Sequence, residues 1–135
     1  MATKRILRLT NTEAIVKIDG AVGSVTIDLD VDLKLVTEDV TTPAVNITLM
    51  QVSGKTGSVL SIARNGENLY DLQSGSAECI DMMNLGGVSD STHNTSDIVV
   101  TSSGAEGQLI MKLRKVSGYQ TKIRPEQTGS DEVPA

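Results

Sequence analysis

Three aspartates at alternate positions, Asp28, Asp30 and Asp32, form the most suggestive chemical pattern in the chain. Calcium is bound by carboxylate oxygens, and calcium-binding loops commonly supply them from alternate residues. The rest of such a loop does not match, because Leu33 stands in place of the required Gly and Asp39 in place of the required Glu. Neighbouring carboxylates on one face of a strand would also lie about 7 Å apart, too far to share an ion. We interpret the row as the solvated face of a strand, with a metal site as the alternative.

The only histidine, His93, lies in a segment rich in Ser, Asn and Asp. One histidine cannot build a histidine-based metal site. A serine triad could be written with Ser89, His93 and either Asp90 or Asp97, but geometry rather than proximity in sequence defines a triad. Polar side chains of this kind are typical of loops, where they hydrogen-bond the adjacent backbone. We therefore predict no catalytic residue, no metal, no cofactor, and a chain that is not an enzyme.

Two glycine turns share single features with phosphate-binding loops. Gly54-Lys55-Thr56 contains the Gly-Lys-Thr triplet, but Leu49 occupies the position of the first glycine of that motif, and no helical pattern follows. The turn that begins at Gly20 has less of the motif. Both segments are predicted to be turns between strands.

The composition indicates a protein that packs and binds rather than one that performs chemistry. Val, Ile and Thr supply 38 of the 135 residues, which suits the half-buried surface of strands. The only aromatic residues are Tyr70 and Tyr119, whereas ligand pockets and base-stacking platforms usually recruit several rings. The single Cys79 excludes an intramolecular disulfide, and we expect it to be a small buried side chain.

The charge balance narrows the choice of partners. The chain has 17 acidic and 12 basic residues and a formal net charge of −5. Nucleic-acid binding requires clustered Lys and Arg, so we expect no nucleic-acid partner and interpret the basic residues as the solvated faces of strands. No hydrophobic run approaches the length of a membrane span, and the basic start lacks the apolar core of a signal peptide. We therefore expect synthesis in a cytoplasm and no membrane partner.

Strand-like segments separated by turn residues recur along the chain, without apolar residues at helical spacing. The expected strands are Arg5–Leu9, Ala14–Ile18, Val25–Leu35, Val45–Leu49, Val59–Arg64, Leu69–Leu72, Cys79–Met83, Asp97–Ser102 and Gln108–Val116. Asn65-Gly66 is a strong hairpin signal. About eight to ten strands with negligible helix predict an all-β antiparallel β-sandwich, either jelly-roll-like or immunoglobulin-like. The expected core is Val25, Ile27, Leu29, Val45, Ile47, Leu49, Ile98, Val100, Leu109, Met111 and Leu113.

A single β-sandwich domain is expected over residues 1–123, because a chain of this length can bury one core without disulfides. Residues 124–135 have loop composition and are predicted to form an extended C-terminal arm. Both ends have too few apolar residues to fold back onto the domain, so we expect them to contact a partner. The predicted partner-contacting residues are Met1, Ala2, Thr3, Arg124, Pro125, Glu126, Val133 and Pro134.

Several segments carry a family resemblance that spans most of the chain. They are Lys4–Arg8, Ser61–Gly66, Gly86–Ser91, Asn94–Val100, Leu113–Tyr119 and Pro125–Gln127. Together they resemble small virion structural proteins of tailed bacteriophages, especially those of marine cyanobacteria. The resemblance implies a capsid decoration (cement) protein that stabilises the phage head in the virion, after assembly in the host cytoplasm. Its partners would be the major capsid protein or other virion proteins, and further copies in a homo-oligomer. The alternatives are a neck, tail or fibre-attachment component or, in a different class, a carbohydrate- or cell-surface-binding β-sandwich.

Overall fold

The computed structural model of the chain describes residues 3–20, 22–54, 59–73, 78–82, 92–103 and 107–121. These residues form nine strands, and the label of each is used below. The strands are β1 (Thr3–Leu9), β2 (Glu13–Gly20), β3 (Gly23–Ile27), β4 (Glu38–Gly54), β5 (Val59–Arg64), β6 (Glu67–Gln73), β7 (Glu78–Asp81), β8 (Ile98–Ser102) and β9 (Gly107–Thr121).

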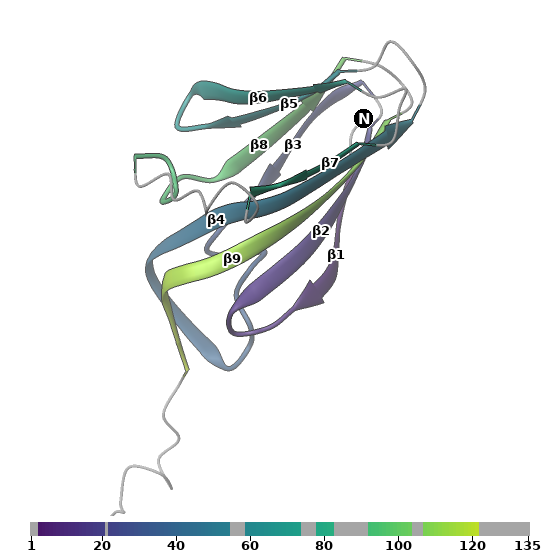
Figure 1. The fold of residues 1–135 in the computed structure, drawn as a ribbon. Helices are drawn as coiled ribbons and strands as arrows, with labels where there is room; N and C mark the ends of the chain where they lie inside the picture. Colours follow the sequence, from purple (N-terminus) through teal and green to yellow (C-terminus); the bar gives the residue numbers. More distant parts are fainter. Residues whose placement is uncertain are drawn as a thin grey trace, which may run out of the picture.

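The strands pair into two antiparallel sheets that face each other (Figure 1). The five-stranded sheet has the order β1-β2-β9-β4-β7, and the four-stranded sheet has the order β3-β8-β5-β6. From β2 to β9 the chain crosses between the sheets at every connection except the β5–β6 hairpin. This is the strand order of a jelly roll. It confirms the predicted all-β sandwich and decides between the two topologies that the sequence left open.

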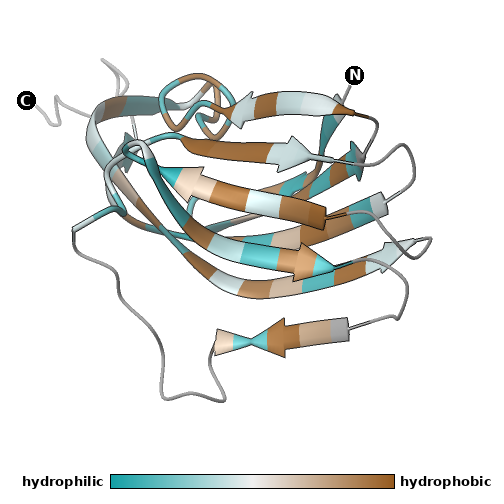
Figure 2. Ribbon diagram, turned by 90° about the horizontal axis from the view of Figure 1, so that it is seen from above, coloured by the Kyte–Doolittle hydropathy of each residue, from teal (hydrophilic) through white to brown (hydrophobic). Residues whose placement is uncertain are grey.

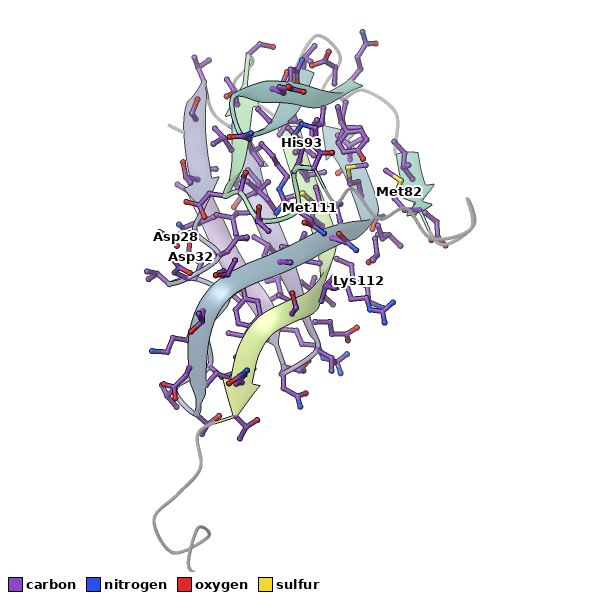
Figure 3. All side chains as sticks on the ribbon, turned by 90° about the vertical axis from the view of Figure 1, so that its left-hand side faces the viewer. Asp28, Asp32, Met82, His93, Met111 and Lys112 are labelled. Atoms are coloured by element: carbon purple, nitrogen blue, oxygen red, sulfur yellow. The ribbon has the colours of Figure 1, made fainter. Side chains whose placement is uncertain are left out.

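Hydrophobic and hydrophilic residues alternate along the strands (Figure 2), and hydrophobic side chains form the buried core between the sheets. On β9, Met111 is buried and Lys112 is exposed, and Figure 3 shows them on opposite sides of the strand. The predicted core residues Ile27, Leu29, Val45, Ile47, Ile98, Val100, Leu109, Met111 and Leu113 are buried, and Val25 packs partly buried against them. The core is therefore aliphatic, as the composition predicts.

The predicted hairpin at Asn65-Gly66 is present, and the first two strands form another hairpin. β1 pairs with β2, and β5 pairs with β6 around Asn65 and Gly66. Asn65 has φ 53° and Gly66 has φ 77°. Positive φ at both central residues is characteristic of a type I′ turn, whose twist matches the right-handed twist of the strands that it joins.

The strand predicted over Val25–Leu35 is wrong beyond Ile27, where β3 ends and a turn-rich loop begins. The Oδ1 atom of Asp28 accepts hydrogen bonds from the backbone N–H groups of Asp30, at 2.9 Å, and Val31, at 3.2 Å. Aspartate side chains compete with strand pairing in this way, because they offer the adjacent backbone a local acceptor. The alternating sequence therefore winds into a loop, and Val31 is 71% exposed.

Leu49 is not in the core, which corrects a second prediction. The β4–β9 register shifts at Thr48, so that Leu49 pairs with Lys112 on the outer face of the five-stranded sheet. Ile47 and Met50 on either side are both buried. A β-bulge inserts one residue and inverts the alternation beyond it. Strict alternation from Ile47 onward misses this inversion.

The structure also bears on the predictions made for Cys79 and for the two ends of the chain. Cys79 is exposed, so the prediction that it is buried is wrong. It lies on β7, a short edge strand that pairs with β4.

Thr3 is the first residue of β1 and pairs with Asp19, so it belongs to the sheet rather than to an arm. The other predicted contact residues, Met1, Ala2, Arg124, Pro125, Glu126, Val133 and Pro134, lie outside the described residues, as does the boundary between residues 123 and 124. Within the described ranges the structure has no helix long and apolar enough to span a membrane.

Candidate ligand-binding groove

A groove of about 820 Å³ lies where β4 begins and β9 ends. Figure 1 shows these parts of β4 and β9 running side by side and curving together. The groove is lined by Asp30, Lys34, Asp39, Val40, Thr41, Thr42, Pro43 and Gln120. Its walls therefore come from the loop after β3, the first residues of β4 and the end of β9.

A backbone bulge forms one wall of the groove. Val40 pairs with Tyr119 and Ala44 pairs with Ser117, so three residues of β4 lie opposite Gly118 alone. Thr42, within the bulge, has φ 49°. A β-branched residue rarely adopts this left-handed conformation, because its Cβ crowds the backbone. Strained backbone of this kind persists where the surrounding structure holds it, and it is found preferentially at functional sites.

Gly118 is the part of β9 that holds the bulge in place. It has φ +86°, and a Cβ atom at this position would lie 2.5 Å from the Cα atom of Pro43 and 2.6 Å from the carbonyl oxygen of Thr42. Only glycine permits so close an approach of two backbones. The shape of the groove wall therefore requires glycine at position 118.

A buried ion pair lies beneath this end of the sheet. The Nζ atom of Lys115 is 2.7 Å from Oε1 of Glu38, and each side chain is only 1% exposed. Lys115 also donates a hydrogen bond to the carbonyl oxygen of Thr10 at 2.9 Å, and the N–H of Leu35 donates to Oε1 of Glu38 at 3.0 Å. The Oε2 atom of Glu38 is buried and has no hydrogen-bond partner among the described residues. The pair ties the β1–β2 turn and the loop after β3 to β4 and β9.

Tyr119 connects the buried pair to the loop that lines the groove. Its ring centroid lies 4.3 Å from Nζ of Lys115, a cation–π distance. Its hydroxyl donates a hydrogen bond of 2.7 Å to the carbonyl oxygen of Leu29. The loop after β3 is thereby fixed against β9, next to Gln120 in the groove wall.

Burial and several nearby carboxylates affect the hydroxyl of Tyr119. Burial raises the pKa of the Tyr119 hydroxyl above its usual value, and the charges of Asp30, Glu38 and Asp28 raise that pKa further. Arg64 acts in the opposite direction but does not reverse the shift. Nearby carboxylates disfavour the tyrosinate because like charges repel.

The Asp28–Asp32 row does not form a metal site. Oδ2 of Asp32 lies 2.5 Å from Nζ of Lys4 and accepts the N–H of Asp28 at 2.8 Å. Figure 3 shows Asp28 and Asp32 together on the same loop. Among the described residues, no group of three or more His, Cys, Asp or Glu side chains is placed to hold a metal ion. The predicted solvated strand face is thus replaced by a turn in which the aspartates bind backbone and Lys4.

The described members of the candidate triad do not come together. Nε2 of His93 is 3.0 Å from Oε2 of Glu67, at the start of β6. Oδ1 of Asp97 accepts a hydrogen bond from the N–H of Leu29 at 3.0 Å. Ser89 and Asp90 lie outside the described residues, as do Lys55 and Thr56 of the Gly-Lys-Thr turn. His93 and Asp97 are therefore engaged in holding loops.

Sequence reasoning missed the buried charges, although one signal could have found them. Leu109, Met111 and Leu113 point inward on β9, and the same alternation leads to Lys115; Arg64 likewise follows Leu60 and Ile62 on β5. Arg64 donates hydrogen bonds to the carbonyl oxygens of Val45 at 2.6 Å, Asn94 at 2.9 Å and Ser96 at 2.7 Å. A charged residue at an inward position predicts a buried polar contact, because burial without one is costly.

Comparison with known proteins supplies a distant likeness of fold. No family model matches the chain, and no curated protein matches it. One matching solved structure is an uncharacterized conserved protein with a double-stranded β-helix domain from Klebsiella pneumoniae, with 13% identity and a TM-score of 0.40, covering 91% of this chain and 85% of that chain. Another is a cupin superfamily protein from Desulfitobacterium hafniense, with 8% identity and a TM-score of 0.37, covering 87% and 79% of the two chains.

These matches correct the functional prediction. They are described as double-stranded β-helix and cupin proteins, and they give the expected capsid decoration protein, or a neck, tail or fibre-attachment component, no support. The prediction of a virion structural protein is therefore wrong on this finding. The comparisons do not test the resemblance, the virion partners or the virion location, and that the chain is not an enzyme stays a prediction. Because identity is so low, we take no activity, substrate or metal from either match.

Proposed function

We propose that this chain is a binding protein whose groove takes a small, positively charged molecule rich in hydrogen-bonding groups. The observation that carries the proposal is the combination of a hollow of about 820 Å³ with the carboxylates of Asp30 and Asp39 on its lining. Both residues are exposed, so a ligand can reach them.

The character of the lining supports this class of ligand. Thr41, Thr42 and Gln120 add hydroxyl and amide groups, while Val40 and Pro43 contribute the apolar part. Such a surface offers hydrogen bonds and charge rather than a large apolar contact, so it selects ligands by polar complementarity. The lining also contains the exposed Lys34, so its formal charge is −1, and its two carboxylates favour an ammonium or guanidinium group over a neutral or anionic one.

The groove also has a fixed shape before any ligand binds. Gly118 holds the bulge at Thr42 and Pro43, and the buried pair of Lys115 and Glu38 holds the strands beneath. A site formed on fixed backbone loses little entropy when the ligand binds, which favours affinity and selectivity.

The proposal is tested by calorimetric titration with spermidine, glucose and citrate as cationic, neutral and anionic probes. We expect spermidine to bind at one site with an affinity that falls as salt rises, and the other two probes not to bind. Asp39→Asn should weaken spermidine binding by about threefold to fivefold, as expected for an exposed charge pair.

A matched control uses a carboxylate far from the groove. Asp19 lies opposite Gln108, at the other end of β9 from Gln120, and its side chain is 56% exposed. Asp19→Asn removes the same charge and should leave spermidine binding unchanged. Equal losses in the two variants would show attraction to net charge alone and would refute the groove, as would tighter binding of glucose or citrate.

A further inference from the structure

The outer face of the five-stranded sheet has a charge opposite to that of the whole chain. Its bases are the exposed Arg5, Arg8, Lys112 and Arg114 and the partly exposed Lys17, and we call this surface the basic face. Its acidic residues are Glu13, Asp19 and Asp81, the last of which pairs with the outward Leu49. Five bases against three acids give this face a formal charge of +2 in a chain of −5. The segregation places a positive surface on one side of an acidic protein.

Two of the three acids, Glu13 and Asp19, are already paired within this face. Oε1 of Glu13 lies 3.4 Å from Arg8, and Oε2 of Glu13 lies 3.4 Å from Lys112. Asp19 lies 3.5 Å from Lys17. The other two bases of the face have no ion pair among the described residues. The surplus positive charge is therefore concentrated on Arg5, at the β1 edge, and on Arg114, on the central strand β9.

A hollow of about 230 Å³ lies on the basic face, beside the β1–β2 turn. It is lined by Thr12, Glu13, Thr48, Lys112 and Arg114. The Thr48 hydroxyl donates a hydrogen bond to the carbonyl oxygen of Lys112 at 3.0 Å, which fixes this side of the hollow on the β4 bulge. An anionic group in the hollow would meet two cationic side chains and only one carboxylate.

Aliphatic side chains lie between the charges. Ile15, Leu49 and Ile110 are partly exposed on this face, and Val116 on β9 is 48% exposed. Arg together with aliphatic area on a flat sheet is typical of a surface that contacts another protein. Figure 3 shows Lys112 projecting from the outer side of the sheet, away from Met111 in the core.

We propose that the basic face docks an acidic protein surface, with one partner carboxylate seated in the hollow between Lys112 and Arg114. The placement of Glu13 favours discrete carboxylates over a continuous row of phosphates, because Glu13 would repel the phosphates that fall against it. The net charge of −5 adds long-range repulsion against extended polyanions such as nucleic acid or an anionic membrane. This interface uses side chains other than those that line the groove, so the proposal does not depend on the proposed function.

The test measures binding of fluorescently labelled poly-L-glutamate by anisotropy at low and at moderate salt. We expect saturable binding to the wild-type chain that weakens as salt rises. The double variant Lys112→Glu with Arg114→Glu should weaken binding by about tenfold or more, since removing interfacial charge reduces association and reversing it adds repulsion. Lys112→Gln with Arg114→Gln should give a smaller loss, and thermal melting confirms that both variants fold.

The matched control is Lys34→Glu, which reverses an exposed lysine in the groove instead of on the basic face. It should change poly-L-glutamate binding by less than about twofold. Equal losses in Lys34→Glu and in the basic-face variants would overturn the proposal.

Three other measurements, on DNA, on lipid vesicles and on self-association, could show that the partner is not an acidic protein. Tighter binding of a short DNA duplex, or of phosphatidylserine-rich vesicles, with the same sensitivity to Lys112 and Arg114, would replace an acidic protein by a phosphate surface. Salt-sensitive self-association lost in these variants would replace it by a second copy of the chain. Absence of poly-L-glutamate binding at low salt would also refute the proposal.

Discussion

The strand β9 takes part in two surfaces of opposite character, and their comparison shows how the molecule separates its charges. Lys112 and Arg114 face outward on a flat sheet that carries surplus positive charge. A few residues further on, Lys115 points inward to a buried carboxylate, and Gln120 reaches a groove with two aspartates. Alternation along a single strand, combined with bulges in the neighbouring β4, directs like side chains to opposite environments.

The inner and outer lysines of β9 should differ most in their effect on stability. Lys115→Met leaves the buried Glu38 carboxylate without its cation, so we expect a loss of about 3–5 kcal/mol in the free energy of unfolding. Lys112→Met removes an exposed contact to Glu13 at 3.4 Å and should cost less than about 1 kcal/mol. Urea denaturation measures both.

A double variant shows whether the loss of stability in Lys115→Met comes from the unpaired charge of Glu38. Glu38→Met combined with Lys115→Met replaces the pair by apolar side chains and should recover most of the loss, because no buried charge remains unpaired. If Lys115→Met and Lys112→Met prove equally mild, the ion pair is not buried as the structure places it.

The bulge at Thr48 predicts a similar contrast on β4. Ile47 is 7% exposed, and Ile47→Ala should cost about 2–5 kcal/mol because it leaves a cavity in the core. Leu49 lies on the outer face, and Leu49→Ala should cost less than about 1 kcal/mol. Thermal or urea unfolding of the two variants checks the register, and a larger loss at Leu49 would mean that the bulge is misplaced.

Alanine substitutions at two glycines with positive φ separate the cost of steric crowding from the cost of backbone strain. Gly118→Ala forces a Cβ atom to within 2.5 Å of Pro43, so we expect about 1–3 kcal/mol of destabilisation and a distorted groove. Gly66→Ala has nothing within 4 Å of the new Cβ atom, and it should cost only about 1 kcal/mol from strain. Spermidine titration of both variants should show weaker binding for Gly118→Ala alone.

We expect the smallest effect on stability from the raised pKa of Tyr119, and this effect is a loss of stability at alkaline pH. Its hydroxyl stays protonated in the folded state at pH values where an unfolded tyrosine, with a pKa near 10.0, has lost its proton. The unfolded state then binds fewer protons, so stability falls as pH rises above about 10 towards the folded pKa. Tyr119→Phe should lose about 1 kcal/mol at neutral pH with its hydrogen bond, yet show a shallower decline at alkaline pH. Tyr70→Phe is the control, and identical alkaline slopes in wild type and Tyr119→Phe would contradict the assignment.

The sequence was sufficient where local chemistry dictates structure. Asn65-Gly66 predicts its hairpin because both residues tolerate positive φ, and the alternation around Met111 predicts which side of β9 is buried. It was insufficient where the chain departs from regular pairing. The Asp28 side chain ends β3 early, and the bulge at Thr48 turns Leu49 outward. Neither feature is visible in the alternation of apolar residues in the sequence, from which the strands and the core were predicted.

The groove could not be predicted because its residues meet only through the jelly-roll crossings. Asp30 and Gln120 are 90 positions apart in the sequence, and the approach of Pro43 to Gly118 depends on a three-residue bulge. Lys115 was the accessible signal, since it continues the inward alternation of β9. The basic face was partly visible as bases alternating with Leu and Ile, but the net charge of −5 concealed their concentration on one sheet.

The most direct test of the account is an NMR titration in which amide shifts of the labelled full chain are followed as spermidine is added. We expect the shifts to concentrate on Asp30, Lys34, Asp39 and Gln120, and the amide signals of Lys112 and Arg114 to stay unchanged. Shifts spread over other exposed acids such as Asp71 and Asp19, or an absence of saturable shifts at low salt, would contradict a groove that binds cationic ligands.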